Sequence, residues 1–240
     1  MKNTSPSFTA RMLAWSVHAF TSSGLVSGFM AILAINESDW PQAMLWLLLC
    51  LFIDGVDGTF ARLFRVKEVL PHVDGKTIDY VIDFATYAII PAYFFYMAEV
   101  VDEFWRLPCV VIILLVSALY YGKDGMVSSD NYFIGFPVMW NMVVFFMVFI
   151  FPQIPLLQTA MVFIFAILHF VPIKFVYPSQ NSRFMKTTIA VTAVFFITVL
   201  LSVFYYPLVP IWVKGLAYGT VGYYAGMAIY MTWGGGKVAE

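Results

Sequence analysis

The stretch DGVDGTFAR at residues 54–62 and the stretch GKTIDYVID at residues 75–83 place four carboxylates inside apolar surroundings. Asp54 and Asp57 are spaced i,i+3 and Asp79 and Asp83 are spaced i,i+4, so each pair lies on one face of a helix. An acidic residue at the centre of a membrane helix costs about 2.5–3.5 kcal/mol on insertion scales, so four acids near one interface need compensation. The spacing predicts two antiparallel helices, joined by a short loop, whose acidic faces meet.

The composition around these stretches indicates a membrane protein. Of the 240 residues, 62% are hydrophobic and 11% are charged, whereas soluble domains have about 45–50% apolar and about 25% charged residues. This excludes a soluble enzyme, a disordered regulator and a disulfide-rich secreted domain. A net charge of −1 gives no support for a nucleic-acid partner. Cys50 and Cys109 both lie in apolar runs, where we expect them to be small core residues.

About eight apolar segments approach the length that a bilayer requires, about 20 residues per helix. They are residues 10–35, 41–62, 77–98, 106–122, 136–152, 156–174, 186–206 and 210–233. We therefore expect an all-α, polytopic integral membrane helix bundle that forms a single domain over residues 1–240. We expect no cleaved signal peptide, because the first segment is long and carries His18 and several hydroxyls.

The distribution of basic residues predicts the orientation of the bundle. With an even number of spans, both termini share one side of the membrane, and that side holds eleven of the 13 Lys and Arg residues. Only Arg106 and Lys214 fall on the other side. We expect both termini to be cytoplasmic and the four acids to lie near the cytoplasmic surface.

Four converging carboxylates repel one another unless protons, basic partners or hard cations compensate them. A ligand set of carboxylate oxygens suits Mg²⁺ or Mn²⁺, and two such ions would bind a diphosphate. Gly58 and Ala61 leave the helix surface bare beside the acids, and Arg62 can bond phosphate oxygens bidentately. A transporter that uses the acids as an ion site is the alternative, but transport does not require these residues and Gly75 at their spacing.

This segment resembles the signature of the CDP-alcohol phosphotransferase family, which reads Asp-x-x-Asp-Gly-x-x-Ala-Arg, a spacer, and Gly-x-x-x-Asp-x-x-x-Asp. All of the fixed positions match, namely Asp54, Asp57, Gly58, Ala61, Arg62, Gly75, Asp79 and Asp83. The spacer, residues 63–74, is longer than is usual in the family. A long spacer with eight spans resembles the bacterial phosphatidylcholine synthase branch, as do, less specifically, residues 130–141 and 171–178.

The resemblance implies a reaction in which an alcohol attacks the phosphatidyl phosphorus of CDP-diacylglycerol, CMP leaves and a phospholipid forms. For this branch the alcohol is choline and the product is phosphatidylcholine. The resemblance also implies that Asp54, Asp57, Asp79 and Asp83 hold two divalent cations, Mn²⁺ or Mg²⁺, and that Asp83 is the general base. It further implies a multi-pass protein of the bacterial inner membrane, an active site toward the cytoplasm and a homodimer.

The resemblance extends to residues that contact the substrates. Choline has no N–H donor and is recognised by aromatic faces, often with a negative charge nearby. The expected CDP-diacylglycerol site consists of Gly58, Ala61, Arg62 and Gly75 with His18 and Thr21 from the first span. The choline candidates are Tyr87, Tyr132, Trp140 and Asn141, and the lipid-phosphate candidates are Lys174 and Arg183. Packing or membrane-interface roles remain open for His18, the aromatic residues and the two basic residues.

Two further questions remain open in the sequence. The acceptor could instead be serine, inositol phosphate or glycerol phosphate, although the few basic residues near the spans disfavour a phosphorylated acceptor. Small residues also form two helical stripes, one of Gly24 and Gly28 and one in the last span. The second stripe consists of Gly215, Gly219, Gly222 and Gly226. Each stripe predicts either close helix packing within the chain or a dimer face.

Overall fold

The structure is a computed structural model that describes residues 6–128, 132–176 and 184–234. Its helices are α1 (Phe8–Asn36), α2 (Trp40–Leu63), α3 (Val66–Val69), α4 (Gly75–Phe84), α5 (Ile90–Met97), α6 (Glu103–Tyr121), α7 (Trp140–Phe145), α8 (Pro155–Leu168), α9 (Met185–Phe204) and α10 (Ile211–Ile229). Three π-helical turns, η1 (Ala85–Ile89), η2 (Phe146–Ile150) and η3 (Tyr230–Gly234), continue α4, α7 and α10. The short strands β1 (Tyr132–Ile134) and β2 (Lys174–Val176) pair in antiparallel fashion.

The predicted all-α membrane bundle is confirmed. In the part of the chain that the structure describes, five helices have the length and hydropathy to cross a membrane, namely α1, α2, the continuous helix Gly75–Met97, α6 and α9. Two further apolar helices, Trp140–Ile150 and Pro155–Leu168, are shorter. Each of the eight expected segments contains a helix, while the count of eight spans and the side of the termini remain predictions.

The expected boundaries of two segments are wrong. The segment expected at 156–174 contains α8, which ends at Leu168, and residues 174–176 form β2 instead. The segment expected at 136–152 begins its helix only at Trp140. In both places the chain leaves the helix to reach the sheet, where Tyr132 pairs with Val176 and Ile134 with Lys174.

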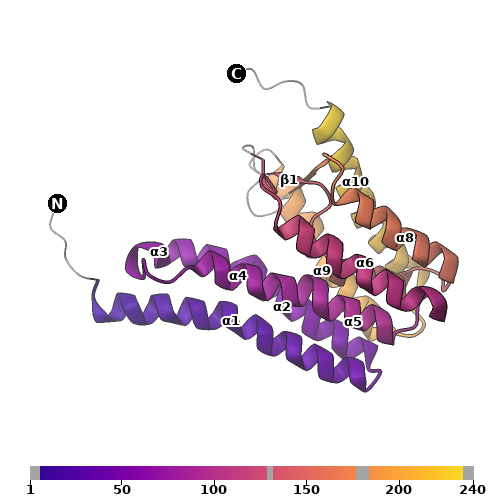
Figure 1. The fold of residues 1–240 in the computed structure, drawn as a ribbon, viewed down its shortest axis with the longest axis horizontal. Helices are drawn as coiled ribbons and strands as arrows, with labels where there is room; N and C mark the ends of the chain where they lie inside the picture. The colour runs from indigo at the N-terminus through magenta and orange to yellow at the C-terminus, as the bar shows by residue number, and fades with distance from the viewer. Residues whose placement is uncertain (1–5, 129–131, 177–183, 235–240) are drawn as a thin grey trace.

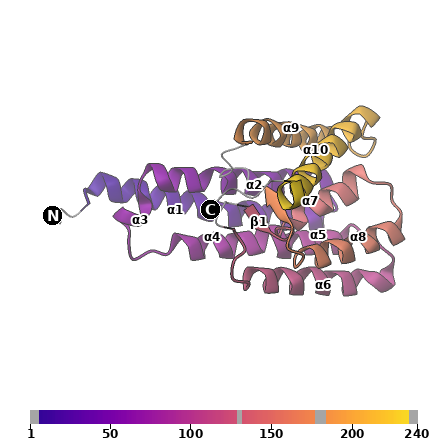
Figure 2. The same ribbon diagram turned by 90° about the horizontal axis from the view of Figure 1, so that it is seen from above.

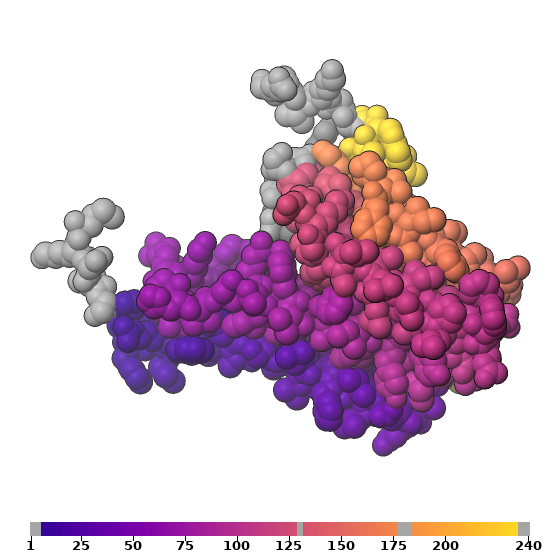
Figure 3. Space-filling model, in the orientation of Figure 1, coloured from indigo at the N-terminus to yellow at the C-terminus, as the bar shows by residue number. Residues whose placement is uncertain are grey.

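The first helices form a long arm beside the rest of the bundle. The Asp39 side chain caps α2 by accepting from the Gln42 N–H at 3.0 Å, and this turns the chain back along α1. Figure 1 shows that α1, α3 and the start of α4 project beyond the C-terminal helices, and Figure 2 shows α9 and α10 on the opposite flank from α6 and α8. The space-filling view is concave where this arm meets the C-terminal helices (Figure 3).

The main core lies at the other end of the bundle, around α5, α7 and η2. Its largest fully buried side chains include Trp140, Phe94, Phe95 and Phe145. A π-helical turn precedes Pro91, which has no N–H and whose ring would clash with the Tyr87 carbonyl in a regular helix. This turn buries Tyr87 toward α2, so the proline shapes the helix next to the acids.

The two glycine stripes have different surroundings. A Cβ atom on Gly24 would lie 3.1 Å from Ile82 Cγ2, and one on Gly28 would lie 2.6 Å from Ile90 Cδ1. The first stripe therefore provides close packing within the chain. A Cβ atom on any glycine of the second stripe, from Gly215 to Gly226 in α10, would meet nothing within 4 Å in the described residues. Packing within the described chain does not account for the α10 stripe, and a dimer face remains a prediction for it.

Candidate active site

Helices α2 and α4 bring the four carboxylates together. Asp54, Asp57 and Asp79 each offer one carboxylate oxygen, and these oxygens all lie within 4.8 Å of one another. The Asp83 carboxyl lies beside that of Asp54, within hydrogen-bonding reach. The four acids, with Thr21 and several apolar side chains, line a small pocket with about 10 Å³ available to the centre of a water-sized sphere. A space of this size holds about one water molecule.

The start of α4 is determined by a helix cap outside the spans. The Asp74 carboxylate accepts from the N–H groups of Lys76 at 3.1 Å and Thr77 at 3.3 Å and from the Thr77 hydroxyl at 2.7 Å. These hydrogen bonds, chiefly those from Thr77, favour the charged form and lower the pKa of Asp74. Because the cap sets where α4 begins, it positions Asp79 and Asp83 one and two turns further along the helix.

The two predicted first-span residues, His18 and Thr21, are both buried. Thr21 lines the pocket and lies beside Asp57. His18 is buried, and a Cβ atom on Gly75 would lie only 3.0 Å from its Cε1 atom. The His18 Nε2 atom has no hydrogen-bond partner among the described residues. The absence of a side chain at Gly75 therefore allows the His18 ring to lie against the start of α4.

Three further signature residues, Gly58, Ala61 and Arg62, lie near the end of α2. Arg62 is exposed, donates to Thr59 Oγ1 at 3.2 Å and lies in electrostatic range of Asp57. A Cβ atom on Gly58 would lie 3.6 Å from Arg62 Nη1, so this glycine leaves the guanidinium close to the helix surface. Ala61 packs in a small apolar cluster with residues of α1 and α3. The arrangement places a cationic group beside the acids on a surface that a phosphate can approach.

Two tyrosines flank the acids on the side of α6. The Tyr87 hydroxyl donates to Asp54 Oδ2 at 2.8 Å, and its ring is only 5% exposed. Tyr121, the last residue of α6, lies in electrostatic range of Asp83, Asp54 and Asp79. Nothing in the sequence singles out Tyr121, because the adjacent Tyr120 has the same side chain and only the rotation of α6 distinguishes them.

The other predicted substrate residues gather around the small sheet. Trp140 is fully buried, stacks on His169 with a ring separation of 5.5 Å and donates to Ser117 Oγ. Asn141 is also fully buried. The Lys174 ammonium lies 5.6 Å from the centre of the Tyr132 ring.

None of these four predicted residues, Trp140, Asn141, Tyr132 or Lys174, is among the described residues that line the small pocket between the acids. Arg183 lies outside the described residues. Of the predicted substrate residues, therefore, Thr21 lines the pocket, Arg62 lies in electrostatic range of Asp57 and Tyr87 donates to Asp54, whereas the later described residues are not among those that line the pocket.

The chain is similar to several curated proteins over most of its length. It is 38% identical over 218 residues to the phosphatidylcholine synthase of Pseudomonas aeruginosa, covering 90% of this chain and 91% of the relative. It is 33% identical to that of Legionella pneumophila over 95% of this chain and 92% of the relative. The Borreliella burgdorferi protein of the same name is 38% identical over 80% of this chain and 82% of the relative.

No family model matches the sequence. The identity to these relatives nevertheless extends far beyond the acidic signature, across nearly all of each protein. Such similarity, together with an all-α membrane bundle that brings the signature acids into one cluster, shows that the chain belongs to the phosphatidylcholine synthase family.

Proposed function

We propose that this protein transfers the phosphatidyl group of CDP-diacylglycerol to choline and so forms phosphatidylcholine and CMP. The observation that carries the proposal is the convergence of Asp54, Asp57 and Asp79 within 4.8 Å, with Asp83 beside them, in a chain related along its length to phosphatidylcholine synthases. In the reaction, the choline oxygen forms a bond to the phosphatidyl phosphorus. The bond from that phosphorus to the bridging oxygen breaks, and CMP leaves.

The acidic cluster fits a divalent-cation site. Its donors are carboxylate oxygens close enough to share an ion, and such oxygens are the ligands that Mg²⁺ and Mn²⁺ prefer. We assign Asp54, Asp57, Asp79 and Asp83 as the residues that would hold two such ions. When bound, the ions supply positive charge that neutralises a diphosphate.

The protein residues have distinct proposed roles around the phosphorus. Asp83 accepts the proton of the choline hydroxyl. Of the two acids on α4, it lies further from the start of the helix. Arg62 binds a phosphate oxygen, and Gly58 and Ala61 keep the α2 surface close to the substrate. His18, Thr21 and Gly75 border the nucleotide; His18 and Thr21 are buried, Thr21 lines the pocket between the acids, and Gly75 lies against the His18 ring. These contacts orient the diphosphate so that the alcohol approaches the phosphorus in line with the leaving group.

The predicted substrate residues of β1, β2 and α7 keep their proposed roles in binding choline and a lipid phosphate. Tyr132, Trp140 and Asn141 remain choline candidates together with Tyr87, and Lys174 and Arg183 remain candidates for a lipid phosphate. We further propose a homodimer in the bacterial inner membrane with the acids toward the cytoplasm, which the distribution of basic residues supports. Choline and CMP then exchange with the cytosol, while the lipid enters from the membrane.

The proposal is tested with the purified full-length protein in detergent, CDP-diacylglycerol and a panel of alcohols, with CMP release and lipid products measured together. We expect CMP release that depends on choline and on Mn²⁺ or Mg²⁺ and stops with EDTA. Asp83→Asn should lower kcat by about 10²–10⁴-fold, the usual contribution of a general base.

Asp74→Asn is the matched control. This substitution also replaces an aspartate with an asparagine, at the N-cap of α4. Because Asn caps helices as well as Asp does, activity should stay within about twofold. Release with serine but not choline would retain the family and overturn the acceptor. No release with any alcohol, together with cation-coupled uptake in proteoliposomes, would favour the transporter instead.

A further inference from the structure

We propose that the Tyr121 ring forms the aromatic wall that holds the trimethylammonium group of choline beside Asp83. This inference rests on the proposed function and assigns a specificity-determining residue outside the signature. Tyr121 ends α6, which packs against η1 and α5. The helix therefore brings a side chain to the acids from a part of the chain that the signature does not include.

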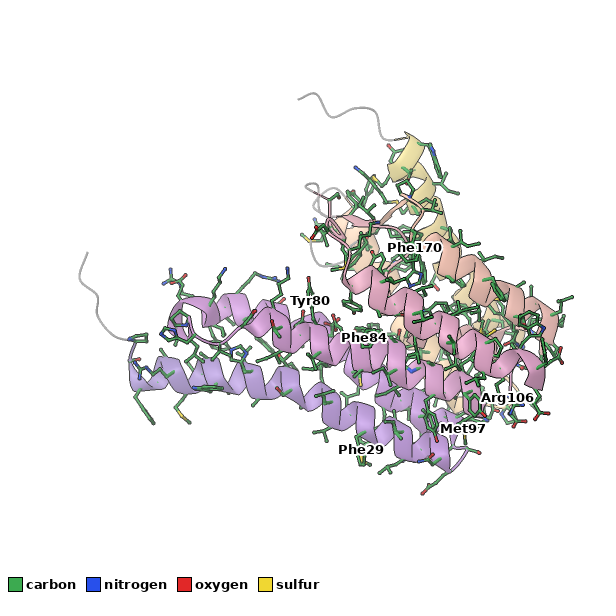
Figure 4. The ribbon with its side chains drawn as sticks, in the orientation of Figure 1. Phe29, Tyr80, Phe84, Met97, Arg106 and Phe170 are labelled. Atoms are coloured by element: carbon green, nitrogen blue, oxygen red, sulfur yellow. The ribbon has the colours of Figure 1, made fainter. Side chains whose placement is uncertain are left out.

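The geometry places Tyr121 between the acids and an open groove. Its side chain lies in electrostatic range of Asp83, Asp54 and Asp79. Its ring meets Tyr80 at 5.7 Å and Phe84 at 5.8 Å between ring centres, both edge to face. Figure 4 shows Tyr80 and Phe84 on successive turns of α4, next to the end of α6.

The same three rings border the groove itself. Tyr80, Phe84 and Tyr121 contribute to the lining of an open, mostly apolar groove of about 420 Å³ on this side of α4. Tyr121 is half-buried, so one part of its ring contacts protein while another part borders open space. No acid is among the described residues that line this groove, but Tyr121 lies in electrostatic range of three acids. An aromatic surface with open space in front of it and negative charge nearby suits a quaternary ammonium group.

The size of choline restricts where its ammonium group lies. Only two carbons separate its hydroxyl from its nitrogen, so an ammonium group must lie within a few ångströms of the base that accepts the hydroxyl proton. At least one aromatic ring of a choline site must therefore lie near Asp83. Tyr87 also lies near Asp83, but it is buried and its hydroxyl is bonded to Asp54. Tyr121 lies in electrostatic range of Asp83, and its half-buried ring borders open space.

A cation already lies at this aromatic group. The Lys76 ammonium is 5.1 Å from the centre of the Tyr80 ring, and Lys76 is exposed. A positively charged group therefore reaches the ring that contacts Tyr121 from the exposed start of α4. This supports an approach for a small cation from the same side.

The test measures charge preference as well as affinity. The protein with Tyr121→Leu is compared with Tyr121→Phe, which keeps the ring, using choline and its neutral isostere 3,3-dimethylbutan-1-ol, as substrate or competitor. Removing a cation–π contact should raise the KM for choline about 5–30-fold in the Leu variant. The KM for CDP-diacylglycerol should stay within about twofold, and the preference for choline over the isostere should shrink. In the Phe variant, the KM for choline and the preference for choline over the isostere should each stay within about threefold of the unmodified protein.

Tyr205→Leu is the matched control, because Tyr205 also lies at the C-terminal end of a helix, as the C-cap of α9, and is exposed. It should change neither the KM for choline nor the charge preference. An unchanged preference in Tyr121→Leu, or an equal loss in Tyr121→Phe, would overturn the inference while leaving the proposed function intact. If the Leu variant does not fold, Tyr121→Trp must retain the preference, and its loss there would overturn the inference. No choline-dependent CMP release by the unmodified protein would overturn the proposed function itself.

Discussion

The Tyr87 hydroxyl donates a 2.8 Å hydrogen bond to Oδ2 of Asp54 and so joins the π-helical turn of η1 to the acidic face of α2. The turn exists because Pro91 interrupts the regular helix four residues later. A proline in the third expected span therefore orients a carboxylate in the second. A hydrogen bond of this kind fixes one carboxylate orientation, which a shared ion site requires.

Tyr87→Phe should lower kcat about tenfold and raise the Mn²⁺ concentration needed for half-maximal activity. The variant keeps the ring but loses a hydrogen bond to a charged group, a contribution of about 1.5–3 kcal/mol. The measurement is CMP release at varied Mn²⁺ with saturating substrates.

Tyr93→Phe provides the matched control on the same continuous helix, because the Tyr93 hydroxyl donates to Asn36 Oδ1 at the far end of α1. Its activity should stay within about twofold. Equal losses in both variants would show that the effect comes from general weakening of the helix and not from Asp54.

The acidic cluster was predictable from sequence because it depends on helix periodicity and a short loop. Spacings of three and four residues put each pair of acids on one face whatever the surrounding fold. The role of Tyr121 was not predictable in the same way. Tyr120 and Tyr121 are adjacent, and packing turns the first toward the Ile134 carbonyl and the second toward the acids.

The small sheet was also beyond the sequence analysis. Its strands, Tyr132–Ile134 and Lys174–Val176, are three residues long and far apart in the chain. Period-two alternation needs about four residues or more to be detected. The apolar pattern therefore predicts residue 174 at the end of a helix, whereas in the structure Lys174 pairs with Ile134 and lies in a strand.

Gly75→Ala should reduce kcat/KM for CDP-diacylglycerol about five- to tenfold without a comparable change in the KM for choline. The added methyl group would lie 3.0 Å from His18 Cε1, so the ring must move from the position that we propose borders the nucleotide. Steady-state kinetics with each substrate varied in turn measure this split. In a His18→Ala background the glycine substitution should have little further effect, because the contact is already gone.

Gly55→Ala is the control for that substitution. Gly55 lies in α2, and a Cβ atom there would meet nothing within 4 Å. Activity should be retained, and stability should rise by about 0.5–1 kcal/mol because alanine favours a helix interior. If kcat/KM for CDP-diacylglycerol also fell in this variant, the effect of Gly75→Ala could not be assigned to His18.

Gly135→Ala should destabilise the protein strongly and lower its melting temperature in detergent by several degrees or more. Gly135 has φ +88°, and a Cβ atom would overlap the backbone carbonyl of His169. That carbonyl belongs to the backbone at the C-cap of α8, so it cannot move aside as a side chain would.

Gly125→Ala distinguishes backbone strain from steric overlap. Gly125 also has a positive φ, +74°, but nothing lies within 4 Å of its Cβ position. It should lose only about 1–2 kcal/mol of stability, and similar melting temperatures for both variants would contradict the close approach.

The cap of α4 should weaken only at distinctly acidic pH. Hydrogen bonds from Thr77 and Lys76 lower the pKa of Asp74, so the native state favours its charged form. The resulting stability is fully present above the ordinary carboxyl pKa, about 3.9, and is lost as the pH falls through the lowered value. Hydrogen exchange of the amides at the start of α4, corrected for intrinsic rates, should therefore show constant protection from pH 7 to about pH 4 and a fall below that. In Asp74→Asn, which cannot titrate, protection at this site should not show the acidic fall, and an identical fall in both proteins would assign it to another group.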